Sequence, residues 1–155
     1  MEVVGFESHT CHKNKTMTIV LSQEQQKVYD STIKICCQIE SEMSTTVDPT
    51  NPAEVEAQLG HIIPWLANLS TLVSNSNAIY DWAKGEVASE IISKPNLMEA
   101  KQDVLKNFIQ GRLAKYSALY ERVEALSKNL RSQVEGLRSI LSYEKEQLNI
   151  NRQKS

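Results

Sequence analysis

Residues 52–93 read PAEVEAQLGHIIPWLANLSTLVSNSNAIYDWAKGEVASEIIS, and apolar residues recur along them in alternating steps of four and three. The series is Val55, Leu59, Ile62, Leu66, Leu69, Val73, Ser76, Tyr80, Ala83 and Val87. This spacing places one apolar seam along a helix for more than four heptads, with only Ser76 and Ala83 as weak members. The stretch therefore predicts a long helix that packs in a bundle.

The ends of this helix are marked by residues that start and stop helices. Asn51 suits the N-cap, Pro52 sits at the first helical position where no donor is lost, and Glu54 follows in the first turn. Lys94-Pro95 should end the helix. Pro64 removes one backbone hydrogen bond from the interior, so we expect a helix over 52–93 that is kinked near residue 64.

Two further helices are expected on either side. Ser22 and Gln25 form a capping-box pattern that starts a helix over 22–44. The segment 97–150 contains no proline and carries a second seam in four-three steps, which includes Val123, Leu130, Val134, Leu137 and Leu141. A helix of that span would be roughly 80 Å long.

Length and composition favour one elongated all-α domain. The chain has 155 residues with only 5 Gly and 4 Pro, too few for a sandwich of short strands. A compact domain of this size has a radius of gyration of about 15 Å, so the last helix must project, bend back or be covered by another copy. We expect an arm over 1–21, one helical domain over 22–155, and homo-oligomerisation through the seam residues. These are Leu59, Ile62, Leu66, Leu69, Val73, Tyr80, Val123, Leu130, Val134, Leu137 and Leu141.

Targeting signals and cysteine usage indicate a cytoplasmic protein. No stretch of 18 apolar residues predicts a membrane span, and the first residues lack the basic start and apolar core of a secretory signal. The 3 Cys are odd in number, and two of them are adjacent, which is unlike a disulfide framework.

The sequence offers little for catalysis or metal binding. His9, Cys11 and His12 could ligate a metal, but their spacing fits no standard zinc pattern. Cys36 or Cys37 would need a general base to act as a nucleophile, and His61 is the only candidate in a predicted helix. Nucleotide-binding and hydrolase motifs are missing from the sequence. We expect neither an enzyme nor a bound cofactor or metal.

The basic residues of the last helix give the strongest functional signal. Residues 95–155 hold 11 Lys and Arg against 7 Asp and Glu, whereas residues 1–94 hold 6 against 12. Residues suited to phosphate contacts recur every seven positions, and Tyr143 lies among them as a candidate for base stacking. The first choices are Arg131, Arg138, Lys145 and Arg152, and the second choices are Lys115 and Arg122. The alternative is that these cations pair with acidic residues of a neighbouring helix, namely Glu54, Glu56, Asp81, Glu86 and Glu90.

The runs YERVEALS at 120–127 and LRSILSYEK at 137–145 resemble small helical proteins of bacteriophage recombination modules. More distantly, residues 55–150 are similar to the UvsY-type recombination mediators. The resemblance implies a homo-oligomeric helical assembly that binds single-stranded DNA and helps to load a recombinase. It implies no catalytic residues.

These observations predict an oligomeric helical accessory protein that binds single-stranded nucleic acid. Two alternatives remain open. One is a phage-type adaptor or inhibitor that binds a protein partner in counter-defence, through an apolar groove between helices. The other is an oligomeric sponge for a small nucleotide, with arginines clustered where subunits meet.

Overall fold

The computed structural model describes residues 19–153, and this part of the chain is all-α. Four helices follow in order: α1 (Gln23–Met43), α2 (Pro52–Ser93), α3 (Pro95–Met98) and α4 (Gln102–Gln153). No strand occurs among these residues. The predicted fold class is therefore confirmed.

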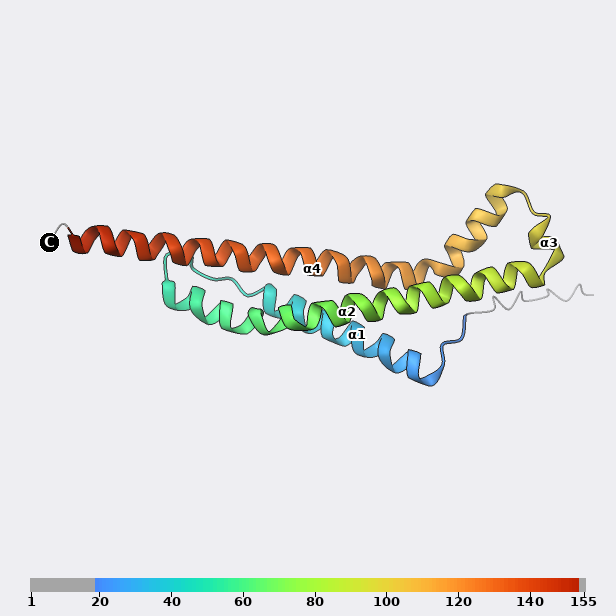
Figure 1. Cartoon of the computed structure of the whole chain (residues 1–155), viewed down its shortest axis with the longest axis horizontal. Coiled ribbons are helices and arrows are strands. Elements are labelled where there is room, and N and C mark those ends of the chain that lie inside the picture. Colours follow the sequence, from blue (N-terminus) through green and yellow to red (C-terminus); the bar gives the residue numbers. More distant parts are fainter. Residues whose placement is uncertain (1–18, 154–155) are drawn as a thin grey trace, which may run out of the picture.

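The predicted start signals of α1 and α2 form as expected. The Gln25 N–H donates to Ser22 Oγ at 3.2 Å, and the Ser22 N–H donates to Gln25 Oε1 at 2.9 Å, which completes the capping box. At the start of α2 the Ala53 N–H donates to Asn51 Oδ1 at 3.2 Å. α2 continues through Pro64 without interruption, and Figure 1 shows it changing direction within its N-terminal half.

The prediction of one helix from residue 97 is wrong at its start. Residues 95–98 form the short α3, and the Ala100 N–H then bonds the Leu97 carbonyl three residues back. The α-helical ladder restarts where the Leu105 N–H bonds the Lys101 carbonyl, and α4 then runs on to Gln153. Figure 1 shows why the break is needed: the chain reverses here, and the first turns of α4 splay from α2 before the helix bends to run beside it.

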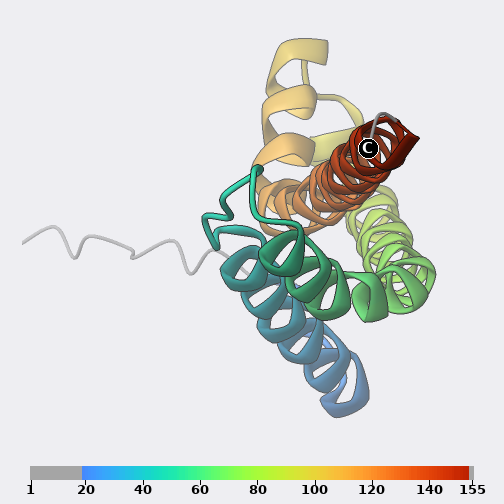
Figure 2. The same ribbon diagram turned by 90° about the vertical axis from the view of Figure 1, so that its left-hand side faces the viewer.

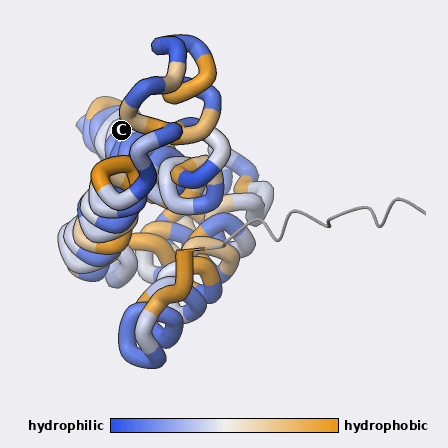
Figure 3. The backbone as a smooth tube through the Cα atoms, turned by 90° about the vertical axis from the view of Figure 1, so that its right-hand side faces the viewer, coloured by the Kyte–Doolittle hydropathy of each residue, from blue (hydrophilic) through white to orange (hydrophobic). Residues whose placement is uncertain are grey.

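α2 and α4 are antiparallel, and α1 packs along both of them (Figures 1 and 2). Apolar residues at intervals along each helix supply the core (Figure 3). Both predicted seams lie in this intramolecular core. Its buried members are Leu59, Ile62, Leu69, Val123, Leu130, Val134 and Leu137, and its half-buried members are Leu66, Val73, Tyr80 and Leu141.

The register of the α2–α4 pair is marked by an aromatic contact. The rings of Tyr80 and Tyr120 stack with centroids 5.7 Å apart and an interplanar angle of 16°. Stacked aromatic pairs add about 0.5–1.5 kcal/mol beyond the area that they bury. Residues close to this stack that are equally far from Tyr80 and Tyr120, counted in opposite directions, therefore lie at about the same level of the bundle.

The C-terminal end of α1 is held by a glutamine from each long helix. Gln58 Nε2 donates to the Glu42 carbonyl at 2.7 Å, and Gln133 Nε2 donates to the Met43 carbonyl at 3.1 Å. These carbonyls belong to the last turn of a helix, where the regular N–H donors four residues on are lost. The Glu42 carbonyl also accepts from the Thr45 N–H at 3.4 Å. The two side chains thus tie α1 to α2 and α4 at once.

The last turns of α4 project beyond the other helices (Figure 1). Past the half-buried Leu141 the apolar side chains are exposed: Tyr143 is 60% exposed, Leu148 is 55% and Ile150 is 38%. α2 begins at Pro52, and Figure 1 shows α4 running on past that point. Of the three outcomes expected for the last helix, the structure shows two: it packs back along α2, and its last turns project. We call residues 142–153 the overhang.

The core contacts predict a large difference between two leucines of α4. Replacing the fully buried Leu130 with Ala should lower the free energy of unfolding by about 2–5 kcal/mol, because it leaves a cavity in the seam. The same change at Leu148, which is 55% exposed, should stay within about 0.5 kcal/mol. Urea unfolding followed by circular dichroism measures both values. Similar losses at the two sites would contradict the burial of Leu130 and the exposure of Leu148.

Two ion pairs to α4 should differ in strength. Arg112 and Lys94 both donate to Glu90, and the Arg112 and Glu90 side chains are only 13% and 15% exposed. Arg112→Ala should therefore lower the free energy of unfolding by about 1.5–3 kcal/mol. Arg122 pairs with Glu40, where the exposures are 37% and 43%, so Arg122→Ala should cost about 0.2–1 kcal/mol.

The pair at Glu90 also has a pH signature. Hydrogen bonds from Lys94, together with Arg112, hold the pKa of Glu90 below its ordinary value of 4.5. The stabilisation from Glu90 is thus present above that ordinary value and is lost as the pH falls through the lowered pKa. Urea unfolding across this acid range should show a smaller loss in Arg112→Ala than in the parent protein, and an equal loss would contradict the assignment.

Candidate nucleic-acid interface

Four cations lie along one side of α4 and have no partner in the range 19–153. Arg131, Arg138, Lys145 and Arg152 are exposed, and their side chains make no ion pair or hydrogen bond there. Because they are seven residues apart, they follow one line for roughly 31 Å at a rise of about 1.5 Å per residue. We call these four residues the basic line.

The basic line lies on the side of α4 that faces away from α1. Gln133 reaches α1, and Arg131 is two residues away, about 200° around the helix. On α2, Asn75 and Ile79 line a cavity against α1, so Asn77 between them points away from α1 in the same manner. The line therefore borders the open edge of the α2–α4 seam.

The acidic residues that could have neutralised this line are engaged elsewhere or do not contact it. Glu90 binds Arg112 and Lys94, and Asp81 pairs with Lys84 at 2.5 Å. Glu54 accepts from the Asp48 N–H at 3.1 Å and from Asn51 Nδ2 at 2.8 Å, which orders the loop before α2. Neither of the other two candidates, Glu56 and Glu86, bonds to the line.

The part of α2 that faces the basic line carries no formal charge. Residues 57–80 contain no Asp, Glu, Lys or Arg in a protein of which 23% is charged. Counted from the Tyr80–Tyr120 stack, Arg131 is level with the buried Leu69, and the exposed Ser70 is its neighbour in sequence. Seven-residue steps from Ser70 reach Ile63 and Asn77, and all three are exposed. We call Ile63, Ser70 and Asn77 the neutral rim.

Sequence reasoning missed this rim, although its signal stands in the sequence. The sequence shows that residues 57–80 carry no charge, but the apolar seam identifies only the buried face of this helix. Which exposed side of α2 borders the basic line depends on where α1 packs, and that became clear only from the structure.

The second-choice cations are held within the body of the protein. Arg122 donates to Glu40 through Nε at 2.8 Å and through Nη2 at 2.6 Å, and these hydrogen bonds hold the pKa of Glu40 below its ordinary value. Lys115 Nζ lies over the Tyr29 ring, 4.4 Å from its centroid. Both residues thus connect α4 to α1 and do not extend the basic line.

Tyr143 is exposed but does not face the same way as the cations. It is two residues from Lys145 and therefore lies about 200° from it around α4. A strand that follows the basic line would not meet this ring. Tyr116 is buried and Tyr120 stacks on Tyr80, so neither offers an open face.

No catalytic or metal-binding cluster forms among residues 19–153. Cys36 is buried, which raises the pKa of its thiol, and Cys37 is exposed beside Arg122, whose Nη2 lies 3.3 Å from Sγ. No hydrogen bond links His61 to either thiol. No group of three His, Cys, Asp or Glu residues lies together within this range. The candidate ligands His9, Cys11 and His12 lie outside the described residues.

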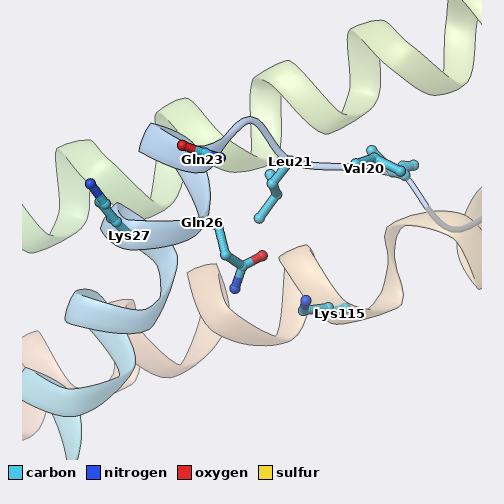
Figure 4. A pocket seen from close by; sticks show the side chains of 7 residues that line it. Val20, Leu21, Gln23, Gln26, Lys27 and Lys115 are labelled. Atoms are coloured by element: carbon cyan, nitrogen blue, oxygen red, sulfur yellow. The ribbon is translucent and has the colours of Figure 1, made fainter.

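A cavity of about 520 Å³ lies where the chain enters α1 (Figure 4). It is lined by Ile19, Val20, Leu21, Gln23, Gln26, Lys27 and Lys115. The Tyr116 hydroxyl donates to the Ile19 carbonyl at 3.2 Å, so residue 19 of the expected arm already lies against α4. Among residues 19–153 the lining holds no carboxylate, thiol or imidazole, and we do not place the functional site there.

Comparison of the chain with protein-family models, with curated proteins and with solved structures finds no match. Within residues 19–153, none of the helices is both long enough and apolar enough to cross a membrane.

The cysteine environments predict selective thiol reactivity. In protein that carries Cys11→Ser, one thiol should react quickly with an aromatic disulfide reagent, and the second should react only after unfolding. The fast thiol is Cys37 because it is exposed, whereas Cys36 is buried in the core. Adding Cys37→Ser should remove the fast phase, and a fast phase that persists in this double variant would contradict the burial of Cys36.

Proposed function

We propose that this protein binds single-stranded nucleic acid along α4, as an oligomeric accessory factor of the recombination-mediator kind. The observation that carries the proposal is the basic line, whose four cations form no ion pair within residues 19–153 and of which Arg131 and Arg138 lie beside a stretch of α2 without charge. Unpaired cations next to a neutral surface give a local positive potential, although the whole chain has a net charge of −2.

The straight course of the line favours a single strand over a duplex. A row of cations about 31 Å long on a helix meets one strand of a duplex over only a short part of its length, because that strand winds away once in about 34 Å. A single strand is flexible and can follow the whole row. Such contacts are to phosphate, so we expect little sequence preference and a strong dependence on salt.

Self-association remains part of the proposal but needs a surface other than the seams. The predicted seam residues lie in the core of one chain and are not free to join copies. The overhang keeps exposed Leu148 and Ile150 next to Lys145 and Arg152. Joining chains at or near the overhang would align several basic lines and raise the affinity for a long strand through multivalency.

A protein-binding role is the second candidate, and one observation favours it. Ile92 is 71% exposed, Met98 is 63% and Val104 is 55%, and these three residues belong to the end of α2, to α3 and to the first turn of α4. Exposed apolar residues at one end of a bundle are typical of a protein contact. This surface lies away from the basic line, so an adaptor role would not depend on it.

Removing the line should remove binding. The triple variant Arg131→Ala, Arg138→Ala, Lys145→Ala should abolish detectable binding of a labelled oligo-dT strand at about 50 mM salt. The parent protein should show a slope of log K against log salt near −2.8, since each phosphate contact of a single strand contributes about −0.7. Fluorescence anisotropy over a salt series measures both quantities.

A matched triple variant distinguishes the effect of losing the basic line from the effect of losing three positive charges anywhere on the protein. Lys34→Ala, Lys101→Ala, Lys106→Ala removes three exposed cations that lie off the line and should leave binding almost unchanged. The proposal is contradicted if the parent protein forms no complex with the strand at about 50 mM salt, or if the two triple variants lose strand affinity equally. A duplex of the same sequence that binds as tightly as the single strand would refute the strand preference.

A further inference from the structure

We propose that the neutral rim of α2 receives the bases of a strand whose phosphates lie on the basic line of α4. This inference rests on the proposed function and deepens it, because it assigns an orientation to the bound strand. Phosphates would contact Arg131 and Arg138, and bases would turn across the seam toward Ile63, Ser70 and Asn77.

The placement of the two surfaces supports this orientation. Both border the edge of the α2–α4 seam that faces away from α1. Counted from the Tyr80–Tyr120 stack, Arg131 is level with Leu69 and Arg138 with Ile62, so Ser70 and Ile63 each lie one residue, or about 1.5 Å, from these levels. Axes of packed helices lie about 8–10 Å apart, so a nucleotide that contacts an arginine of α4 can reach the rim of α2 with its base.

The chemistry of the rim suits bases and not phosphates. The Ser70 hydroxyl can donate and accept, and it makes no hydrogen bond among the described residues. Asn77 Nδ2 donates to Asp81 Oδ2 at 3.1 Å, which leaves the amide oxygen free to accept. Ile63 is 37% exposed and offers an apolar surface for a base face. Base edges carry matching donors and acceptors, whereas a phosphate would gain no ion pair here.

The boundaries of the charge-free stretch agree with the proposed path. Charged residues stop at Glu56 and resume at Asp81, so the rim opposite Arg131 and Arg138 lies inside the neutral part. Lys145 and Arg152 belong to the overhang, beyond the rim. We therefore assign base contacts to the part of the strand beside Arg131 and Arg138, and phosphate contacts alone to the part beside the overhang.

The test removes the bases from the strand and, separately, the polar side chains of the neutral rim from the protein. The rim variant Ser70→Ala, Asn77→Ala and the control variant Asn68→Ala, Thr71→Ala remove the same numbers of amide and hydroxyl groups from exposed positions of α2. Asn68 and Thr71 lie about 200° and 100° around the helix from Ser70, off the rim. Each protein is titrated with an oligo-dT strand and with an abasic strand of equal length, which keeps the phosphates and lacks the bases.

The rim variant should bind oligo-dT about fivefold more weakly or worse and bind the abasic strand unchanged, since only base hydrogen bonds are lost. Its salt slope should equal that of the parent protein, and the control variant should behave as the parent with both strands. Equal affinity of rim variant and parent for oligo-dT, or an equal loss with both strands, overturns the orientation while leaving strand binding intact. Failure of the parent protein to bind either strand instead overturns the proposed function.

Discussion

The antiparallel pairing of α2 with α4 is the contact on which the other features depend. The apolar seams of both helices are buried in this pairing, and the Tyr80–Tyr120 stack marks its register. The pairing leaves one edge of the seam to α1 and the other edge open. It also leaves the end of α4 uncovered, because α4 runs on past the start of α2 at Pro52 (Figure 1).

Ion pairs engage only some of the cations of residues 19–153: Lys84, Lys94, Arg112 and Arg122 are paired, whereas Lys34, Lys101 and Lys106 are unpaired there, as is the basic line. Arg112 and Lys94 share Glu90, and Arg122 binds Glu40. These pairs lie at the joints between helices, where they hold elements in place. Arg131 and Arg138 of the basic line lie beside residues 57–80, which contain no Asp or Glu, so this part of α2 offers them no ion pair. The overall balance of charge hides this local excess.

Periodicity predicted the fold well because apolar spacing and caps act locally. The Ser22 and Asn51 caps and the end of α2 were all legible in the sequence. The break before Gln102 was not, because residues 97–101 carry no strong helix breaker and the interruption follows from the reversal of the chain. The sites were partly predictable: the line of cations follows from spacing, whereas the engagement of Arg122 and Lys115 depends on where α1 packs. The two-residue separation of Tyr143 from Lys145 was visible from the start and already places them on different sides of a helix.

The glutamine contacts to α1 have a consequence for how the chain finds its register. A regular heptad seam tolerates a slip of one repeat, because apolar residues again meet apolar residues. Such a slip would displace Gln58 from Gln133 by about 10.5 Å along the bundle. The two side chains could then no longer bond the Glu42 and Met43 carbonyls together. α1 can therefore dock with both hydrogen bonds only when α2 and α4 are paired in the correct register. In this way α1, the shortest of the three main helices, disfavours the mispaired forms that α2 and α4 alone would permit.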